Sequence, residues 1–187
     1  MVIHFGLGFD SEKVWDFDIR QDFDNLILGP VGLVNFLKEE LGEFSPQVDS
    51  INRILNYEKA VDEFIEEYPS LLDSFKVDSF AFASKLLEIR DWLKLNDVIQ
   101  KGWSEDNLRF HLIEKIEGSF LVEGFSDDFI TVKNQVKNIV FEDDFSILLY
   151  NELDSMPLHL RSLFDQFNSD SIVEYKLDFG NFPNGDL

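Results

Sequence analysis

Cysteine is absent from this 187-residue sequence. Its absence excludes disulfide bonds, thiolate nucleophiles and cysteine-ligated zinc, and it is typical of proteins in reducing compartments. Only five Pro and ten Gly are present, which argues against a linker or a low-complexity segment. The composition instead suits a packed domain, because 44% of the residues are hydrophobic and 20 of them are Phe.

Long apolar runs are missing as well. Leu26–Leu28 and Ile147–Tyr150 are among the longest, far short of the roughly 20 residues that span a membrane. The N-terminus reaches an acid within ten positions and lacks the basic and apolar regions of a signal peptide. We therefore expect a cytoplasmic protein that does not associate with a membrane.

Positive charge is scarce, since 16 Lys and Arg oppose 37 Asp and Glu and give a formal net charge of −21. Nucleic-acid binding depends on cations that replace counterions at the phosphates. No stretch concentrates such cations; the closest, Lys94–Lys101, carries two. The balance predicts poor nucleic-acid binding and points to a basic protein partner or to mimicry of a nucleic acid.

The first fifty residues predict two strands and a helix. Residues 2–9 (VIHFGLGF) are rich in β-branched and aromatic side chains, which is typical of a strand. Leu26–Leu28 predicts a short buried strand that ends at Gly29-Pro30. Leucine and valine then recur at helical spacing as far as Leu41, and Gly42 supplies the stop.

Residues 50–137 carry a helical pattern almost throughout. Pro69 predicts the end of the first of these helices. The serines expected to cap the later helices are Ser79, Ser104 and Ser126. Phe120–Val122 predicts a short strand between the last two helices.

Period-two patterning returns towards the C-terminus. The predicted strands are Asn138–Phe141, Ser146–Tyr150 and Ser171–Leu177. Ser155 and Pro157 predict the start of a helix between the last two. Strands at both ends of the chain around a helical middle predict an α/β fold with a mainly helical insertion. The expected division is residues 1–48 as the first part of the α/β core, 49–138 as the insertion, and 139–187 as the return to the core.

The first strand-to-helix turn is the place where a nucleotide-binding fold would hold phosphate. It reads GLGFDSEK at residues 6–13. Lys13 is not preceded by Gly and is followed by Val14 rather than a hydroxyl residue, so the phosphate-loop pattern is not met. Asp10 and Glu12 would also repel phosphate. The sequence therefore predicts no ATP binding here.

A second candidate for anion binding is Gly29–Gly32, whose backbone N–H groups precede a helix. Pro30 removes one of those donors. A tight strand-to-helix turn is the favoured interpretation.

Glu174-Tyr175-Lys176 in the last predicted strand is half of a PD-(D/E)xK nuclease centre. In such a centre Asp and Glu hold Mg²⁺ and Lys orients the attacking water. Asp170 is too close in sequence to belong to a partner strand. Asp143 or Asp144 would serve only if the fold brought them next to Glu174. The sequence predicts no working nuclease site.

The remaining chemical groups are scattered. The histidines are His4, His111 and His159, none of them at metal-ligand spacing. Glu142–Asp144 is acidic but lacks the glycines of a calcium loop. An exposed tryptophan among Trp15, Trp92 and Trp103 would be a candidate anchor for a partner. We expect no catalytic, cofactor-binding or metal-binding residues in this chain; an independent hydrolase built from acids and a histidine stays open.

Three segments, in order along the chain, resemble one bacterial family. Gly29–Leu33 with its leucine-rich helix resembles a GPLGLL opening. Leu86–Leu95 (LLEIRDWLKL) is similar to an LLxLRDxLxLAGW helix, and Pro157–Leu163 with the strand that follows resembles an LPPxxRxLLxxL helix and strand. The family consists of PD-(D/E)xK nucleases fused to an inactivated superfamily I helicase, the AddB type of helicase–nuclease.

The resemblance implies a RecA-like helicase core domain that has lost ATP binding, which agrees with the missing phosphate loop. The nuclease centre and its Mg²⁺ would lie far towards the C-terminus of a much longer chain, so we expect this chain to be a fragment without a cofactor of its own. Its acidity fits poorly with direct contact to DNA.

The sequence thus leads to an ATPase-dead N-terminal domain of a DNA-processing nuclease in repair or defence. It would act as a scaffold and as a docking surface for a helicase partner or for the remaining domains of its own chain. The alternative is a free-standing acidic binding module, such as a DNA mimic or inhibitor that occupies a basic cleft.

Overall fold

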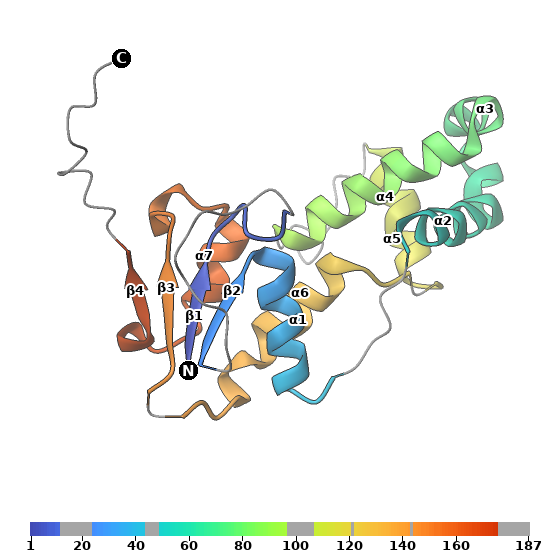
Figure 1. Ribbon diagram of the computed structural model, residues 1–187. Helices are drawn as coiled ribbons and strands as arrows, with labels where there is room; N and C mark the ends of the chain where they lie inside the picture. Colours follow the sequence, from blue (N-terminus) through green and yellow to red (C-terminus); the bar gives the residue numbers. More distant parts are fainter. Residues whose placement is uncertain (12–23, 44–48, 97–106, 121, 143, 176–187) are drawn as a thin grey trace, which may run out of the picture. The chain divides into compact units, whose positions relative to one another are not determined.

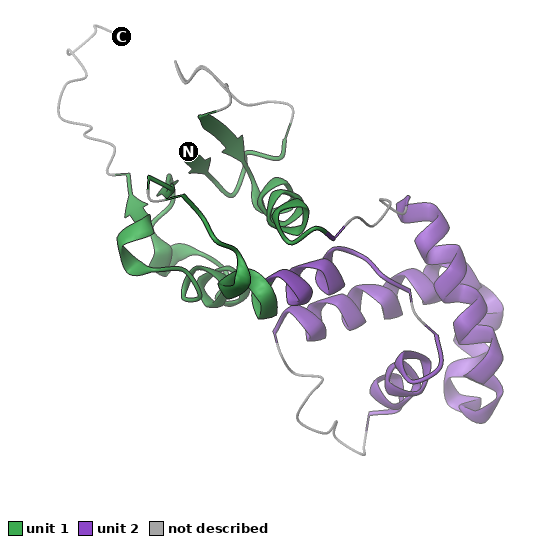
Figure 2. Ribbon diagram, turned by 90° about the horizontal axis from the view of Figure 1, so that it is seen from below, with its two compact units in different colours: residues 1–42, 133–187 green, residues 43–132 purple. Residues whose placement is uncertain are grey.

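The computed structural model describes residues 1–11, 24–43, 49–96, 107–120, 122–142 and 144–175. The chain divides into two compact units, coloured separately in Figure 2. Unit 1 consists of residues 1–42 and 133–187, and unit 2 consists of residues 43–132. Unit 2 is therefore inserted in sequence between the two parts of unit 1.

Unit 1 contains a four-stranded parallel sheet (Figure 1). Its strands are β1 (Val2–Phe5), β2 (Asn25–Leu28), β3 (Ser146–Leu149) and β4 (Ile172–Glu174). The strand order is β2-β1-β3-β4, so two strands more than 140 residues apart are neighbours, with Ile3 beside Ile147 and Phe5 beside Leu149. The protein is therefore α/β.

One face of the sheet forms the core of unit 1. Ile3, Phe5, Ile147 and Leu149 alternate along β1 and β3 and are fully buried. Phe5 meets Phe164 of α7 (Leu158–Phe164) edge to face, with ring centroids 5.1 Å apart. Helix α7 thus packs on this face, as expected for a parallel sheet.

Helix α1 (Pro30–Glu40) follows β2 directly. Pro30 suits the first helical position because it has no N–H and a fixed φ. Gly42 beyond the C-terminus has φ +74°, a conformation that favours glycine. The strand, the turn and the stop of this segment lie where the sequence predicts them, but β2 is half-buried rather than buried.

Unit 2 is helical in its described residues. Its elements are α2 (Ser50–Phe64), the 3₁₀ turn η1 (Ile65–Glu67), α3 (Pro69–Val77), α4 (Ser79–Leu95), α5 (Leu108–Glu117) and α6 (Phe125–Gln135), the last of which runs on into unit 1. Tyr57 and Val61 of α2, Leu86 of α4 and Leu112 of α5 are buried together in one hydrophobic core. The helices of this unit are amphipathic, which is why their periodicity is visible in the sequence.

Several predicted helix ends are shifted. Pro69, which the sequence predicts to end a helix, is also the first residue of α3. Asp78, rather than Ser79, caps α4, because its carboxylate accepts a hydrogen bond from Ala81 N at 2.9 Å. Ser126 lies inside the first turn of α6, and Ser104 falls outside the described residues.

The C-terminal helix also starts later than predicted. Ser155 lies in the 3₁₀ turn η4 (Leu153–Ser155), and the N-cap of α7 is Pro157.

Two predicted strands are wrong. Asn138 ends the 3₁₀ turn η3 (Val136–Asn138), and residues 139–141 pair with no strand of the described chain. Phe141 instead stacks on Phe145 with ring centroids 3.9 Å apart, so aromatic packing rather than sheet pairing explains its apolar character. Phe120 and Val122 also lie outside any strand, and Phe120 packs edge-on against Phe64.

No helix among the described residues has the length and apolar character needed to cross a membrane.

Candidate functional site

The carboxyl ends of the strands in unit 1 are the first place to look for a ligand site. In open parallel sheets, ligands bind outside these ends, at the point where the chain leaves neighbouring strands in opposite directions. Here that point lies between β1 and β3, because β2 is beside β1 on one side and β4 is beside β3 on the other. The polar groups that follow the strands at this edge decide what it can bind.

Asp10 is the first of these groups, and it binds the N-terminus of α1. Its carboxylate accepts hydrogen bonds from Val31 N at 2.7 Å and from Gly32 N at 2.9 Å. A Cβ at Gly29 would lie 2.4 Å from Cγ of Asp10, so glycine is needed for this approach. An anionic side chain at a helix N-terminus is favourable because of the helix dipole. The two N–H groups that an external anion would need are therefore already bonded within the chain.

The other polar groups at this edge are bonded in the same way. Oδ1 of Asn151, after β3, accepts a hydrogen bond from Leu7 N at 2.9 Å. Oε1 of Glu174 accepts one from Leu153 N at 3.1 Å. Three oxygen-bearing side chains at this edge thus stabilise the loops that follow the strands.

Within the described residues, Glu174 belongs to no group of three His, Asp or Glu side chains that could hold a metal ion. Tyr175 stacks on Tyr150, with ring centroids 4.9 Å apart, and Lys176 falls outside the described residues. Asp144 is exposed and pairs with the N-terminal amine at 3.3 Å, and Asp170 lies in the 3₁₀ turn η5 (Ser169–Ser171). Asp143, like Glu12 and Lys13 of the degenerate phosphate loop, falls outside the described residues.

The three histidines lie in separate places. His4 is 8% exposed, and its ring nitrogens lie 3.0 Å from the Tyr150 hydroxyl and 3.3 Å from Oδ1 of Asn25. His111 belongs to α5 and His159 to α7. Within the described part of the chain, no three His, Asp or Glu side chains are grouped so as to hold a metal ion.

Unit 2 contains a second concentration of charge, a cluster around one fully buried arginine that the sequence did not predict. We call it the charge cluster; its members are Arg53, Arg90, Asp91, Lys94, Glu117 and Asp127. Three cations and three carboxylates from α2, α4, α5 and α6 balance one another. The cluster therefore ties four helices together without a net charge.

Arg90 is the centre of the charge cluster and is 0% exposed. Its guanidinium makes two hydrogen bonds to Glu117, at 2.8 and 3.0 Å, and two to Asp127, at 2.6 and 2.7 Å. It also donates to Asp91 at 2.9 Å. Planar bidentate pairing of this kind is specific to arginine.

Arg53 extends the cluster to α2. It holds Asp91 with two hydrogen bonds, at 2.5 and 2.7 Å, and donates to the carbonyl of Glu123 at 2.9 Å. A Cβ at Gly124 would lie 2.3 Å from Cζ of Arg53, so only glycine leaves room for the guanidinium. The Gly124 N–H in turn donates to Asp127 at 2.9 Å.

The pairing sets the protonation of two partly buried carboxylates of the cluster, Asp91 and Asp127. Burial acts to raise the pKa of Asp91, but the hydrogen bonds and charge of Arg53 outweigh it and hold that pKa below its usual range. Burial likewise acts to raise the pKa of Asp127, and Arg90 and then Lys94 hold it below its usual range. Both groups therefore stay ionised to a lower pH than a free aspartate does.

We predict that unit 2 loses stability as the pH falls below about 4. Because the folded pKa values of Asp91 and Asp127 lie below the unfolded value of about 3.9, the unfolded chain binds more protons in this range. The stabilisation is complete above the unfolded pKa and is lost as the pH falls through the folded pKa values. Urea unfolding followed by circular dichroism at pH 7, 5, 4 and 3 measures it. Asp127→Asn should flatten the dependence, and an equally steep dependence in that variant would contradict the assignment.

Trp92, the one tryptophan among the described residues, is 61% exposed on α4 beside the charge cluster residue Asp91.

Comparison with protein-family models, curated proteins and solved structures finds no match to this chain. The candidate sites therefore rest on geometry alone. That geometry consists of polar groups bonded to their own backbone in unit 1 and a balanced ion cluster in unit 2.

Proposed function

We propose that the chain is a non-catalytic scaffold domain, a RecA-like helicase core that no longer binds nucleotide, from a bacterial DNA-processing nuclease of the AddB type. Its role is to dock a helicase partner or further domains of its own chain. The observation that carries this proposal is the carboxylate of Asp10 on the N-terminus of α1. A helix N-terminus beside a parallel strand is where nucleotide-binding folds place phosphate, and a carboxylate there excludes a second anion.

The placement of the three family-like segments supports the proposal. Gly29–Leu33 forms the junction of β2 and α1. Leu86–Leu95 lies in α4, where its Arg and Asp are Arg90 and Asp91 of the charge cluster. Pro157–Leu163 leads into α7, where Arg161 donates to the carbonyl of Met156 at 2.8 Å. The polar residues of these segments thus serve folding, as a scaffold requires.

We predict that calorimetric titration of the protein with Mg²⁺-ATP gives no binding heat, and that no phosphate is released on incubation. Asp10→Ala should lower the free energy of unfolding by about 0.5–2 kcal/mol, the usual effect of losing a helix cap. Glu39→Ala, an exposed acid at the other end of α1, is the control and should have little effect. ATP binding at micromolar concentration by the unaltered protein would overturn the proposal.

The nuclease part of the proposal has its own test. Sequencing of the open reading frame beyond the codon for Leu187 should reveal several hundred further codons and a strand-borne D…E-x-K pattern. A stop codon at that position would overturn this part and favour the free-standing acidic binding module.

A further inference from the structure

A groove on unit 2 lies between α2, the end of α3 and the start of α4. It encloses about 350 Å³, and its lining residues are Leu55, Glu58, Lys59, Asp62, Phe75 and Ser79. All of them belong to unit 2, so the groove is complete within one compact unit. Nothing in the candidate sites described above uses it.

Two apolar residues, Leu55 and Phe75, line the groove, and further apolar side chains are exposed on the same helices. Phe75 is 8% exposed. Ile51 and Leu55 of α2 are 57% and 39% exposed, and Phe80, beside Ser79 on α4, is 40% exposed. Large apolar side chains left open along a concave surface are typical of interaction sites.

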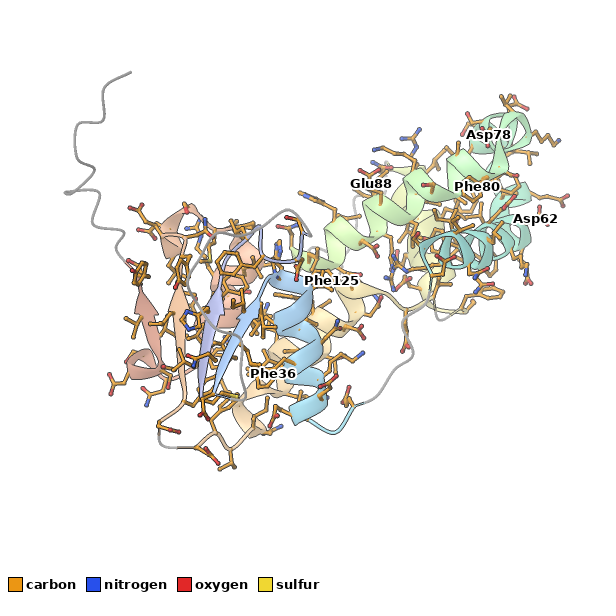
Figure 3. All side chains as sticks on the ribbon, in the orientation of Figure 1. Phe36, Asp62, Asp78, Phe80, Glu88 and Phe125 are labelled. Atoms are coloured by element: carbon orange, nitrogen blue, oxygen red, sulfur yellow. The ribbon has the colours of Figure 1, made fainter. Side chains whose placement is uncertain are left out.

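The apolar and acidic residues of α2 share one face. Ile51, Leu55, Glu58 and Asp62 follow one another at spacings of four, three and four residues, which places them in a single line along a helix. Figure 3 labels Asp62 on α2, and Asp78 and Phe80 at the start of α4. On this face of α2, the apolar residues Ile51 and Leu55 are therefore followed by the carboxylates of Glu58 and Asp62.

The segment around the groove is strongly acidic. Residues 49–80 carry eight Asp and Glu against three Lys and Arg, and one of those three, Arg53, is bound to Asp91 in the charge cluster. Glu58 accepts a hydrogen bond from the Ser79 hydroxyl. Among the described residues, no cation pairs with Glu58 or Asp62. The lining also contains Lys59, so its two carboxylates and one ammonium group leave a net negative charge that is available to a ligand.

We propose that this groove docks a basic amphipathic helix of a partner protein. The apolar side of that helix would pack on Leu55, Phe75 and Phe80, as in other helix-in-groove complexes. Its Lys and Arg residues would lie along the edge formed by Glu58 and Asp62. An acidic helix or a nucleic acid would be repelled by the same carboxylates. The inference rests on the docking role proposed above and specifies the surface and the chemistry of the partner.

The test uses a synthetic probe, a fluorescein-labelled 18-residue peptide of Leu and Lys arranged as an amphipathic helix. Fluorescence anisotropy at 0.15 M salt, where the screening length is about 8 Å, measures its dissociation constant. The protein should bind this peptide and should not bind a peptide in which every Lys is replaced by Glu. Asp62→Lys and Leu55→Ser should each weaken binding about tenfold, equivalent to 1.4 kcal/mol.

Matched controls lie on α5. Glu114→Lys changes an exposed carboxylate and Leu108→Ser an apolar residue of similar exposure, 43%, both away from the groove. Each should change the dissociation constant less than about twofold. Because all four altered residues are exposed, circular dichroism should show folded variants.

Two results would overturn the inference: no binding of the Leu–Lys peptide, or equal weakening by the groove and control variants. The second would mean that the peptide responds to net charge alone. Either outcome leaves the nucleotide titration and the reading frame unaffected. A failure of this inference is therefore distinguishable from a failure of the proposed function.

Discussion

Replacing Arg90 with methionine is expected to lower the free energy of unfolding by about 3–5 kcal/mol. The guanidinium is fully buried and neutralises Glu117 and Asp127, which come from two other helices. Methionine fills a similar volume but leaves Glu117 with Lys94 alone and Asp127 with Lys94 and the more distant Arg53, 3.9 Å away. The penalty arises mainly from these uncompensated charges rather than from lost packing.

The measurement is urea unfolding followed by far-ultraviolet circular dichroism, which reports the helices of unit 2. Lys85→Met is the control, because the Lys85–Glu88 pair on α4 is two-thirds exposed and should contribute no more than about 1 kcal/mol. Arg90→Lys should remain strongly destabilised, since an ammonium group cannot pair with two carboxylates in bidentate geometry. Stability within about 1 kcal/mol of the original protein in Arg90→Met would contradict the central role of the charge cluster.

Local sequence signals predict much of the fold. The β2–α1 junction is predictable because Leu26–Leu28, Pro30 and Gly42 each carry a strong local preference. Residues 139–141 suggest a strand that does not form, because Ile, Val and Phe in succession are residue types typical of strands, although Val140 is 95% exposed. The aromatic packing of this segment depends on Phe145, which no local period reveals.

The candidate sites are much harder to predict. From the sequence, Asp10 is an acid that would repel phosphate in a degenerate phosphate loop. In the fold, its carboxylate accepts hydrogen bonds from Val31 N and Gly32 N, which lie 21 and 22 residues further along the chain. Arg90 belongs to one of the family-like helices, but its partners Glu117 and Asp127 are 27 and 37 residues away. Such pairings are set by tertiary packing, so a single sequence offers charges without indicating which of them meet.

The edge of the sheet around Asp10 and the charge cluster share one physical feature. In both, the polar groups form their hydrogen bonds and ion pairs within the chain. A catalytic site usually leaves some groups under-bonded or with pKa values shifted towards neutrality. Here the pKa shifts of Asp91 and Asp127 run the other way and keep these carboxylates ionised. These shifts favour a structural role for the charge cluster. Exposed surfaces such as the groove on unit 2 are therefore the better candidates for binding a partner.

Tyr57 is the exception, and it yields the second large prediction. Its side chain is fully buried, and its hydroxyl has no hydrogen-bond partner among the described residues. Burial, and then the nearby charge of Glu117, raise the pKa of Tyr57, so the hydroxyl stays protonated and polar. A buried hydroxyl without a partner costs about 1–3 kcal/mol.

Tyr57→Phe keeps the ring among the packed helices and removes only that hydroxyl, so it should raise the free energy of unfolding by about 1–3 kcal/mol. Urea unfolding measures the change, and Tyr68→Phe, at a half-buried position at the end of η1, is the control expected to change little. A lower stability for Tyr57→Phe would mean that the hydroxyl donates to the charge cluster in solution. In that case the cluster would include Tyr57, and Glu117 would be its acceptor. A gain in stability would instead indicate that the six charged residues satisfy one another and that unit 2 tolerates one unpaired polar group beside them.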